Sequence, residues 1–296
     1  MMKKRIFCAL IIFCLIFMVS CAKNDQQSAN NTLVDILGNQ IVVDEPIQRI
    51  VSLSPAATEI LYAIGADEYL LANTIYCNYP EQANNKPKIG DFSNPNMELI
   101  LSYEPQLVLT ASGVQENIIN KFRELNIPVF SLDAYNVEDV LKNIQMAGVI
   151  TGKQKQAGVV ISEINDVLGE IATNVASQTE NPTVFIEIWD DPLMTAGGAS
   201  FISDMIVRAG GINIAADMDV EYAEFSREQL LSKDPCVYLL IGYKNQVNNL
   251  RDRAGFAALS AVKNNRVYII EDDLLTVCGP RIVEGIQEMY KCFYPQ

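Results

Sequence analysis

The hydrophobic and polar residues of this chain change repeatedly between the pattern of a buried strand and that of an amphipathic helix. Short runs of β-branched and aliphatic residues, typical of strands buried in a parallel sheet, occur at Arg49–Leu53, Leu107–Thr110, Val129–Leu132, Thr183–Ile188, Val237–Ile241 and Val267–Ile270. Apolar residues at helical spacing occur at Met97–Tyr103, Gln115–Leu125, Val137–Val149, Phe201–Ala209 and Arg281–Cys292. Strands that alternate with helices predict parallel α/β sheets.

The beginning of the patterned region carries turn and capping signals. Apolar and polar residues alternate over Leu33–Asp44 around Gly38, which predicts a β-hairpin. Ser54 and Pro55 then stand directly before an apolar helical period that continues to Ile64. Serine is a preferred N-cap and proline is favoured in the first helical turn, so we expect a helix to begin here.

One long helical stretch divides the chain. Apolar residues recur at helical spacing from Lys153 to about Val175, and no strand pattern interrupts them. Alternating strands and helices both precede and follow this stretch. We therefore predict an α/β protein with two Rossmann-like lobes, residues 33–150 and 179–296. A single long α-helix within residues 151–178 joins them, and a ligand cleft lies between the lobes.

An internal repeat supports the division into two lobes. The segments Glu98–Leu109 and Glu228–Leu239 carry glutamate, leucine, serine and proline at identical positions. Each predicts a short helix, a proline and a buried strand. A second pair, Ile127–Asp133 and Arg266–Asp272, is also similar, but any α/β protein repeats helix and strand in this way. We interpret the first pair as equivalent positions in two lobes of one topology.

The N-terminal residues have the composition of an export signal. Three basic residues precede the apolar run Ile6–Val19, which is shorter than the ~20 residues that a membrane-spanning helix needs. We therefore predict a signal peptide over residues 1–20. Its Met-Val-Ser-Cys end resembles the lipobox of bacterial lipoproteins, which implies lipidation of Cys21; cleavage without lipid is the alternative. Residues 21–32, rich in Asn, Gln and Ser, are expected to form a flexible tether to the membrane.

Composition narrows the possible functions. The formal net charge of −14 leaves no basic surface for a nucleic-acid backbone and suits a partner with a basic face. The chain has no histidine, which removes the commonest general base and the commonest zinc ligand. We therefore expect no metal site and no catalytic site.

The cysteines give no sign of chemistry either. Four of them follow the tether without CxxC spacing, and we expect them to be small buried apolar residues. Several disulfide pairings are open among Cys77, Cys236, Cys278 and Cys292.

Five segments together resemble the cobalamin-binding proteins of bacterial ABC importers. They are Arg49–Glu59 (RIVSLSPAATE), Tyr76–Pro80 (YCNYP), Asn96–Leu109, Ser226–Leu230 (SREQL) and Gly279–Ile282 (GPRI). The resemblance covers the chain from Leu33 onward and extends to the wider helical-backbone group of substrate-binding proteins, which also serve ferric siderophores and haem. It implies two lobes on a rigid connecting helix, and a transported corrinoid rather than a cofactor.

The resemblance also implies a set of ligand-binding positions, carried over by local motif. They are Ala56, Tyr76, Phe92, Trp189, Tyr222 and Asp273. Tyr76, Phe92 and Tyr222 fall in predicted loops, and Trp189 falls in a predicted loop after the first strand of the second lobe. The broad apolar faces of a corrinoid suit aromatic rings, and its amide rim needs hydrogen-bond partners. For each ring taken singly, burial in a lobe core is the alternative.

Two glutamates of the internal repeat have a separate expected role. The resemblance implies that Glu98 and Glu228, one on each lobe, dock against arginines of an ABC permease dimer. Their position at predicted helix N-termini offers a simpler alternative, because the helix dipole stabilises acidic side chains there by about 0.3–1 kcal/mol. The expected protein is monomeric, extracytoplasmic and lipid-anchored, on the cell surface or in the periplasm.

Three other functions are alternatives to that of a cobalamin-binding protein. A ferric-siderophore or haem-binding protein of the same fold is the closest alternative, although few basic residues lie near the expected cleft and only Tyr76 or Tyr222 is expected to offer haem iron an axial ligand. An α/β enzyme is less favoured, because no GxGxxG, GxxxxGK[ST] or GxSxG motif occurs. The acidic runs at Asp190-Asp191 and Glu271–Asp273 consist of adjacent residues, whose side chains point apart. A metal-ion receptor of related fold would need histidine ligands.

Overall fold

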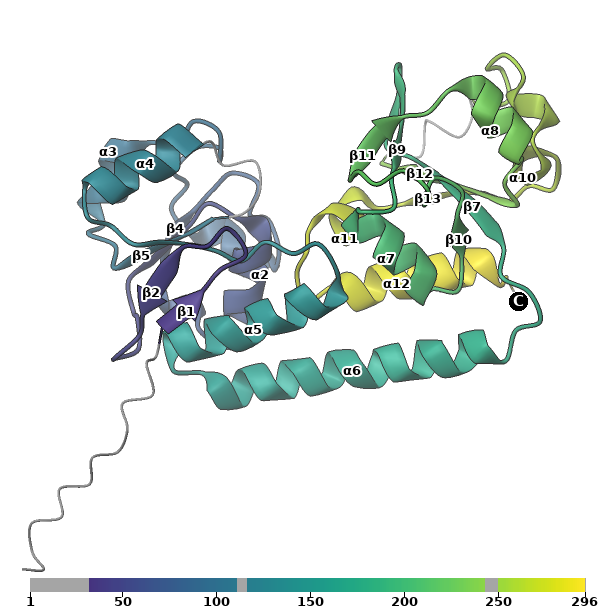
Figure 1. Ribbon diagram of the computed structural model, residues 1–296. Helices are drawn as coiled ribbons and strands as arrows, with labels where there is room; N and C mark the ends of the chain where they lie inside the picture. Colours follow the sequence, from purple (N-terminus) through teal and green to yellow (C-terminus); the bar gives the residue numbers. More distant parts are fainter. Residues whose placement is uncertain (1–31, 111–115, 243–249, 296) are drawn as a thin grey trace, which may run out of the picture. The chain divides into compact units, whose positions relative to one another are not determined.

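The computed structural model describes residues 32–110, 116–242 and 250–295, and the chain from Leu33 onward forms one compact unit (Figure 1). The predicted signal peptide, Cys21 and the tether up to residue 31 lie outside the described residues. We use "N-terminal lobe" for residues 33–151 and "C-terminal lobe" for residues 183–295.

Each lobe contains a four-stranded parallel sheet. In the N-terminal lobe the strands are β3 (Ile50–Ser52), β4 (Leu70–Asn73), β5 (Leu107–Thr110) and β6 (Val129–Ser131). In the C-terminal lobe they are β7 (Thr183–Glu187), β10 (Ile212–Asn213), β12 (Val237–Ile241) and β13 (Val267–Ile270). The strand orders are β4-β3-β5-β6 and β10-β7-β12-β13, so the two sheets share one topology. This confirms the predicted α/β class with two Rossmann-like lobes.

Helices surround these sheets. The N-terminal lobe has α2 (Pro55–Ala63), α3 (Met97–Ser102), α4 (Glu116–Glu124) and α5 (Val137–Thr151). The C-terminal lobe has α7 (Phe201–Arg208), α8 (Arg227–Lys233), α10 (Ser260–Lys263), α11 (Asp272–Thr276) and α12 (Ile282–Phe293). The predicted N-cap of α2 is present, because Ser54 Oγ accepts a hydrogen bond from Ala57 N at 3.1 Å. The predicted first hairpin is formed by β1 (Thr32–Val34) and β2 (Gln40–Val42), which pair in a separate two-stranded sheet.

The internal repeat corresponds to the same local structure in both lobes. Asn96 caps α3 by accepting a hydrogen bond from Leu99 N at 3.0 Å, and Ser226 caps α8 by accepting one from Gln229 N at 3.1 Å. Each helix is followed, within two residues, by an acidic residue that precedes a proline and has a left-handed backbone: Glu104 (φ 46°) and Asp234 (φ 37°). A positive φ is uncommon outside glycine. Its occurrence at matched positions shows that the two segments are structural equivalents.

The second pair of similar segments, which was weak on its own, is also equivalent in structure. Asn126 (φ 56°) and Asn265 (φ 55°) both adopt the left-handed conformation directly before β6 and β13. The residues that follow each asparagine close the same type of turn: Ile127 N donates to Phe122 O at 2.9 Å, and Arg266 N donates to Ala261 O at 2.8 Å. Asparagine is one of the few residues that adopt this conformation readily, because its side chain can hydrogen-bond locally.

A single long helix joins the lobes. Helix α6 (Gln154–Ala176) packs against α5, α7 and α12, and its fully buried residues are Ala157, Ile164 and Ile171. These lie seven residues apart, so they form one narrow stripe along the helix. The start of α6 approaches α5 closely, since a Cβ atom at Gly148 would lie 2.7 Å from Ala157 Cβ. The described part of the chain contains no helix long and apolar enough to cross a membrane.

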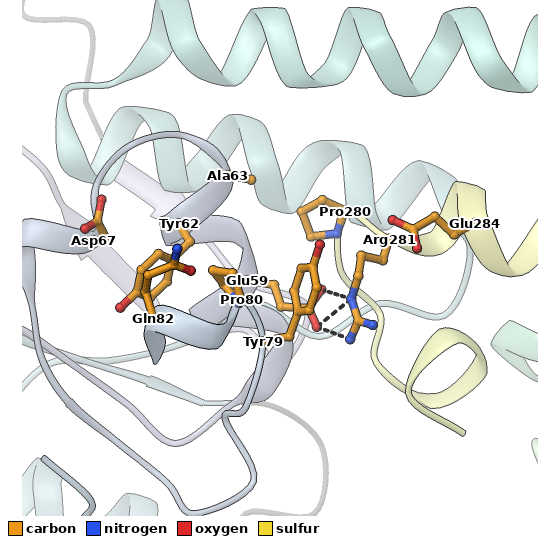
Figure 2. Close-up of a pocket in the computed structure, with 10 residues that line it drawn as sticks. All are labelled: Glu59, Tyr62, Ala63, Asp67, Tyr79, Pro80, Gln82, Pro280, Arg281 and Glu284. Carbon is orange, nitrogen blue, oxygen red and sulfur yellow. Dashed lines mark hydrogen bonds and ion pairs between the residues drawn. The ribbon is translucent and has the colours of Figure 1, made fainter. Parts of the chain in front are cut away.

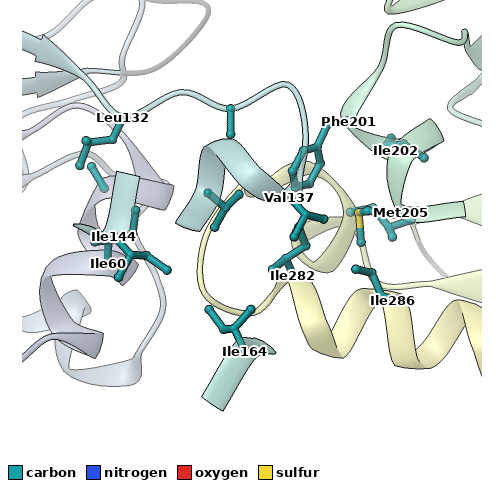
Figure 3. Close-up of a cluster of buried hydrophobic side chains, with 14 of the residues drawn as sticks. Ile60, Leu132, Val137, Ile144, Ile164, Phe201, Ile202, Met205, Ile282 and Ile286 are labelled. Carbon is teal, nitrogen blue, oxygen red and sulfur yellow. The ribbon is translucent and has the colours of Figure 1, made fainter. Parts of the chain in front are cut away.

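The buried core is continuous from one lobe to the other. One hydrophobic cluster includes residues of α2 and α5 on the N-terminal side and of α7 and α12 on the C-terminal side (Figure 3). Val137 of α5 lies near Phe201 of α7 and Ile282 of α12 in this view. Because the same apolar contacts serve both lobes, their separation would expose core surface.

An ion-pair network also connects α5 with α7. The guanidinium of Arg208 binds both carboxylate oxygens of Glu138, at 2.6 and 2.7 Å, and donates through Nε to Asp204 at 2.9 Å. Asp204 in turn accepts a hydrogen bond from Val137 N at 3.0 Å, at the beginning of α5. This network therefore fastens the first turn of α5 to the C-terminal lobe.

The C-terminal lobe contains a small sheet that the sequence analysis did not predict. Strands β8 (Trp189–Asp190), β9 (Leu193–Ala196) and β11 (Tyr222–Glu224) pair antiparallel in the order β11-β9-β8. The prediction that Trp189 and Tyr222 lie in loops is therefore wrong. A two-residue strand is too short to show an alternating pattern, and Tyr222 pairs with Ala196, which is distant in sequence.

Candidate functional site

The predicted ligand positions gather at the carboxyl ends of the parallel strands. This is where open α/β sheets bind ligands. Ala56 follows β3, Tyr76 follows β4, Trp189 follows β7 and Asp273 follows β13. Figure 1 shows β11, which carries Tyr222, on the side of the C-terminal lobe that faces the N-terminal lobe.

An aromatic pair forms the N-terminal wall of this site. The ring centroids of Tyr76 and Phe92 are 5.5 Å apart with an interplanar angle of 49°, a tilted arrangement that aromatic rings favour. Tyr76 is 50% exposed, so most of one side of the pair remains available to a ligand. The structure therefore brings together two residues that are separated by fifteen positions in the sequence.

The loop that carries Tyr76 is anchored to the neighbouring helix. Cys77 is buried, and its Sγ lies 3.3 Å from Thr58 Oγ1 of α2 and 3.2 Å from Thr74 Oγ1. Ala56, in the first turn of α2, is itself buried, with only 6% of its surface exposed. Ala56 therefore contributes mainly to the packing of α2.

The C-terminal wall carries two exposed aromatic side chains. Trp189 is 62% exposed, and its indole N–H donates to the carbonyl of Asp191 at 2.9 Å, which leaves the ring faces free. Burial raises the pKa of the Tyr222 phenol to about 12, and Cys278, Glu221, Asp133 and Asp272 add to this effect. Asp133 follows β6 of the N-terminal lobe, so a group of that lobe lies close enough to Tyr222 to act on its pKa. No ring contact joins Trp189 to another predicted position within the described residues.

Asp273 lies beside a buried ion pair that the sequence analysis did not single out. Glu59 of α2 and Arg281 at the start of α12 form three hydrogen bonds of 2.5–3.1 Å, and their side chains are only 4% and 11% exposed. The guanidinium also stacks 4.0 Å from the centroid of the Tyr79 ring (Figure 2). Burial raises the pKa of the Glu59 carboxyl, Arg281 opposes this rise, and Asp273 adds to it.

This ion pair was present in the quoted motifs but had no assigned role. Glu59 ends the RIVSLSPAATE segment, and Arg281 is the arginine of GPRI. Glu59 and Arg281 carry opposite charges, and each stands in an apolar motif of a different lobe. An unpaired charge buried among apolar residues is costly, so this pattern could have indicated that the two form a pair.

A pocket of roughly 580 Å³ adjoins the ion pair on both lobes. Its lining includes Tyr62, Asp67, Tyr79, Gln82, Arg281 and Glu284 (Figure 2). None of the six predicted ligand positions belongs to this lining. Its lining combines Asp67, which precedes β4, with Tyr79 and Gln82, which follow β4 in the same loop as Tyr76.

The two predicted docking glutamates are exposed and structurally matched. Glu98 and Glu228 each occupy the second position of a capped helix, α3 and α8 respectively. Figure 1 shows both helices on the side of their lobes remote from α6. Neither glutamate takes part in an ion pair with another described residue, so both carboxylates are available to a partner.

The cysteines of the described residues form no disulfide and no metal site. Cys77, Cys236, Cys278 and Cys292 are all free, so no disulfide pairs them. Cys236 is exposed and Cys278 partly exposed, so the expectation that these four cysteines are buried holds only for Cys77 and Cys292. The described ranges contain no group of three or more cysteine or acidic side chains placed to hold a metal ion.

These features together define a binding protein with two lobes. The chain belongs to the periplasmic binding protein family, whose model matches residues 50–274. It is the substrate-binding component of an ABC importer, and its family and relatives are solute-binding proteins rather than enzymes.

Several known proteins are similar to it. An uncharacterized ABC transporter substrate-binding lipoprotein of Bacillus subtilis, YvrC, is 30% identical over 284 residues, which cover 93% of this chain and 89% of the relative. The vitamin B12-binding protein of Vibrio cholerae is 28% identical over 250 residues, covering 84% and 89%. The solved structure of that protein, BtuF, superposes with a TM-score of 0.75 and 28% identity, covering 84% of this chain and 97% of BtuF. The haem-binding protein RhuT of Roseiflexus gives a TM-score of 0.74 and 26% identity, covering 84% and 98%.

Proposed function

We propose that this protein captures a corrinoid of the cobalamin type between its lobes and delivers it to an ABC permease. The observation that carries the proposal is the pair of aromatic walls: Tyr76 with Phe92 on one lobe, and Trp189 with Tyr222 on the other. A corrin ring presents two broad apolar faces, which match exposed aromatic rings on opposite sides.

The charges around these walls favour a corrinoid over haem or a ferric siderophore. Carboxylates rather than arginines surround Tyr222, with Glu221, Asp133 and Asp272 close enough to act on its pKa. The neutral amide groups on a corrin rim can donate hydrogen bonds to carboxylates, and Asp273 is the predicted acceptor. A ligand that carries carboxylates of its own would be repelled.

Haem is the second candidate, because RhuT is a haem-binding protein of similar fold. Tyrosine ligates haem iron as the phenolate. Burial and neighbouring acids hold the pKa of Tyr222 at about 12, which opposes the loss of that proton. The loss of the phenol proton is therefore more costly at Tyr222 than at an ordinary tyrosine, and the proposal uses Tyr222 as a hydrogen-bond donor to the corrinoid.

The proposal includes the location and the partner. Cys21 carries the lipid anchor, and the segment after it tethers the monomeric binding unit to the membrane. Glu98 and Glu228 dock against basic residues of the permease dimer, one glutamate on each half. Exposed carboxylates on matched helices suit a two-fold symmetric partner, since complementary charges fix the register of docking.

Titration of the purified full-length protein with cyanocobalamin and, separately, with haem tests the ligand. We expect cyanocobalamin to be retained at one equivalent and its visible spectrum to change on binding. Tight retention of haem together with no retention of cyanocobalamin would contradict the proposal. Equal affinities for cyanocobalamin and haem would contradict the argument that the carboxylates around Tyr222 disfavour haem.

A further inference from the structure

The loop that carries Tyr76 and Tyr79 closes on itself around a buried polar centre. We define the Tyr76 loop as residues 74–87. Its two ends are joined, because Asn73 N donates to Pro87 O at 3.0 Å and Ile89 N donates to Asn73 O at 3.0 Å. The Tyr76 loop is thus a closed excursion from the end of β4 whose ends lie side by side.

The side chain of Lys88 occupies the centre of this loop. Its ammonium group donates to Asn73 Oδ1 at 2.9 Å, to Cys77 O at 2.8 Å and to Ala83 O at 3.2 Å. Asn73 is fully buried, and its Nδ2 donates to the same Ala83 carbonyl at 3.1 Å. Lys88, which follows the loop, therefore binds Asn73, which precedes the loop, and two carbonyls within the loop, those of Cys77 and Ala83.

The three bonds of Lys88 use the full donor capacity of an ammonium group. An ammonium group has three N–H donors and no acceptor, and all of its acceptors here are neutral oxygens. Lys88 has no ion pair with any of the residues that the structure describes. Hydrogen bonds from a charged donor are shorter and stronger than neutral ones. Lysine at this position is therefore used to organise backbone, not to balance an acid.

The carbonyl that Lys88 holds most closely belongs to the residue after Tyr76. Fixing Cys77 O fixes the backbone on which the exposed Tyr76 ring stands, opposite Phe92. The same bonds keep the Cys77 thiol buried against Thr58 and Thr74. A ligand that binds to a ring held in place pays less conformational entropy than one that must order a loose loop.

We propose that Lys88 is a positioning residue, which holds the Tyr76 loop from inside in the conformation that binds the ligand. This inference rests on the proposed function only for the identity of the ligand. Its mechanical part, that Lys88 keeps the loop closed, is independent of what binds. Lys88 itself touches no ligand.

The test uses the buried Cys77 thiol as a reporter of loop opening. The full-length protein is exposed to iodoacetamide under native conditions, and alkylation of each cysteine is followed by peptide mass spectrometry. Cys292, which is buried on α12 in the other lobe, reports global unfolding in the same sample. Lys86→Met is the matched control, because Lys86 donates a single bond, to Asp67 O at 2.7 Å, and none to the loop carbonyls that Lys88 holds.

We expect Lys88→Met to accelerate alkylation of Cys77 by about tenfold or more while Cys292 stays protected, since charged hydrogen bonds are each worth about this factor. Lys86→Met should label as the wild-type protein does. Lys88→Gln, which keeps two donors without the charge, should be intermediate, and it decides the question if Lys88→Met does not fold. Equal acceleration at Cys77 and Cys292, or no acceleration at either, would overturn the proposal.

Binding of cyanocobalamin, measured by equilibrium dialysis, completes the test. Lys88→Met should lose about tenfold in affinity and Lys86→Met should lose nothing. A rapidly labelled Cys77 with unchanged affinity would refute the positioning role. If the wild-type protein binds haem instead of cyanocobalamin, the proposed function fails, and the affinity comparison is made with haem.

Discussion

At the scale of single residues, two tyrosines of similar exposure stand in different surroundings. Tyr76 and Tyr222 are 50% and 47% exposed. Tyr76 packs against another ring, whereas Tyr222 lies among acidic groups that act on its phenol. We infer that Tyr76 supplies apolar contact area, and that Tyr222 supplies a hydrogen-bond donor as well as a ring.

Removal of the Tyr76 ring should weaken ligand binding without unfolding the protein. We expect Tyr76→Ala to lower the affinity for cyanocobalamin by about tenfold, the value of a lost aromatic contact of about 1–1.5 kcal/mol. Calorimetric titration measures the loss. Tyr290→Ala is the matched control, because Tyr290 of α12 and Tyr294, which follows the helix, form a ring pair with a similar centroid distance, 5.1 Å. Equal losses in both variants would show that the effect is structural.

The thiol of Cys278 should remain unreactive at moderately alkaline pH. Burial raises its pKa to about 12, and the carboxylates of Asp133 and Glu221 contribute. Alkylation requires the thiolate, so its rate should rise about tenfold per pH unit from pH 8 to pH 10.5 without levelling off. The protein unfolded in urea is the control, where the rate should level off near the ordinary thiol pKa of about 8.5. A plateau near pH 9 in the folded protein would contradict the assignment.

At the scale of elements, the sequence predicted most helices and strands because their patterns were long or repeated. The bounds of β5, β12 and β13 agree with prediction, and α6 agrees within one residue at each end. What the sequence could not show are elements set by distant partners. The short strands β8, β10 and β11 depend on pairing with β9 and β7, and the glycines at 197 and 198 owe their place to carbonyls of residues 220 and 216 that approach them closely.

The candidate site also combines residues that have a local sequence pattern with residues that depend on distant partners. Tyr76 could be proposed from a local motif, and Glu98 and Glu228 from the repeat, and their roles stay predictions. The Glu59–Arg281 pair was missed because its members are far apart in sequence, and only the folded chain places them together. The inner role of Lys88 was missed for a similar reason, since its acceptors are backbone carbonyls, which have no sequence signature.

Charge reversal on α3 and α8 should separate docking from ligand binding. Glu98→Lys with Glu228→Lys places cations at two helix N-termini, which costs about 0.3–1 kcal/mol of stability each. We expect the double variant to keep its affinity for cyanocobalamin and to lose transport in cells. The control is Glu170→Lys on the exposed face of α6, which should transport normally. Loss of ligand affinity in the double variant would place these glutamates in the binding site instead.

At the scale of the whole molecule, two ion pairs between residues that the structure describes connect the lobes, and they differ in burial. The Glu59–Arg281 pair is nearly withdrawn from solvent, whereas Glu138 of the Arg208 network is exposed. Breaking a buried pair leaves an uncompensated charge, which costs about 3–5 kcal/mol, whereas an exposed pair is worth about 0–1 kcal/mol. The lobes therefore depend more on Glu59 and Arg281.

Arg281→Met should destabilise the protein by about 3–5 kcal/mol at neutral pH, measured by urea unfolding. Burial then raises the pKa of Glu59 unopposed, so the folded state binds a proton more readily than the unfolded state. Stability should consequently fall as the pH rises from about 4.5 through the raised pKa of Glu59. Arg208→Met is the control, and its loss of stability should be smaller and should depend less on pH. A loss that does not depend on pH would show that Glu59 is not the group left unpaired.

The number of residues in helix α6 helps to set how the two aromatic walls are oriented relative to each other. Ala157, Ile164 and Ile171 are buried, and other apolar residues of the helix pack partly buried against the same core, so substitutions should be tolerated on the remaining exposed face. One inserted residue, however, would turn everything beyond it by about 100° and advance it by about 1.5 Å. Substitutions on the exposed face of α6 should therefore change ligand binding little, whereas an insertion should abolish it. The relative position of the two walls depends on the number of residues in the helix more than on the identity of the exposed ones.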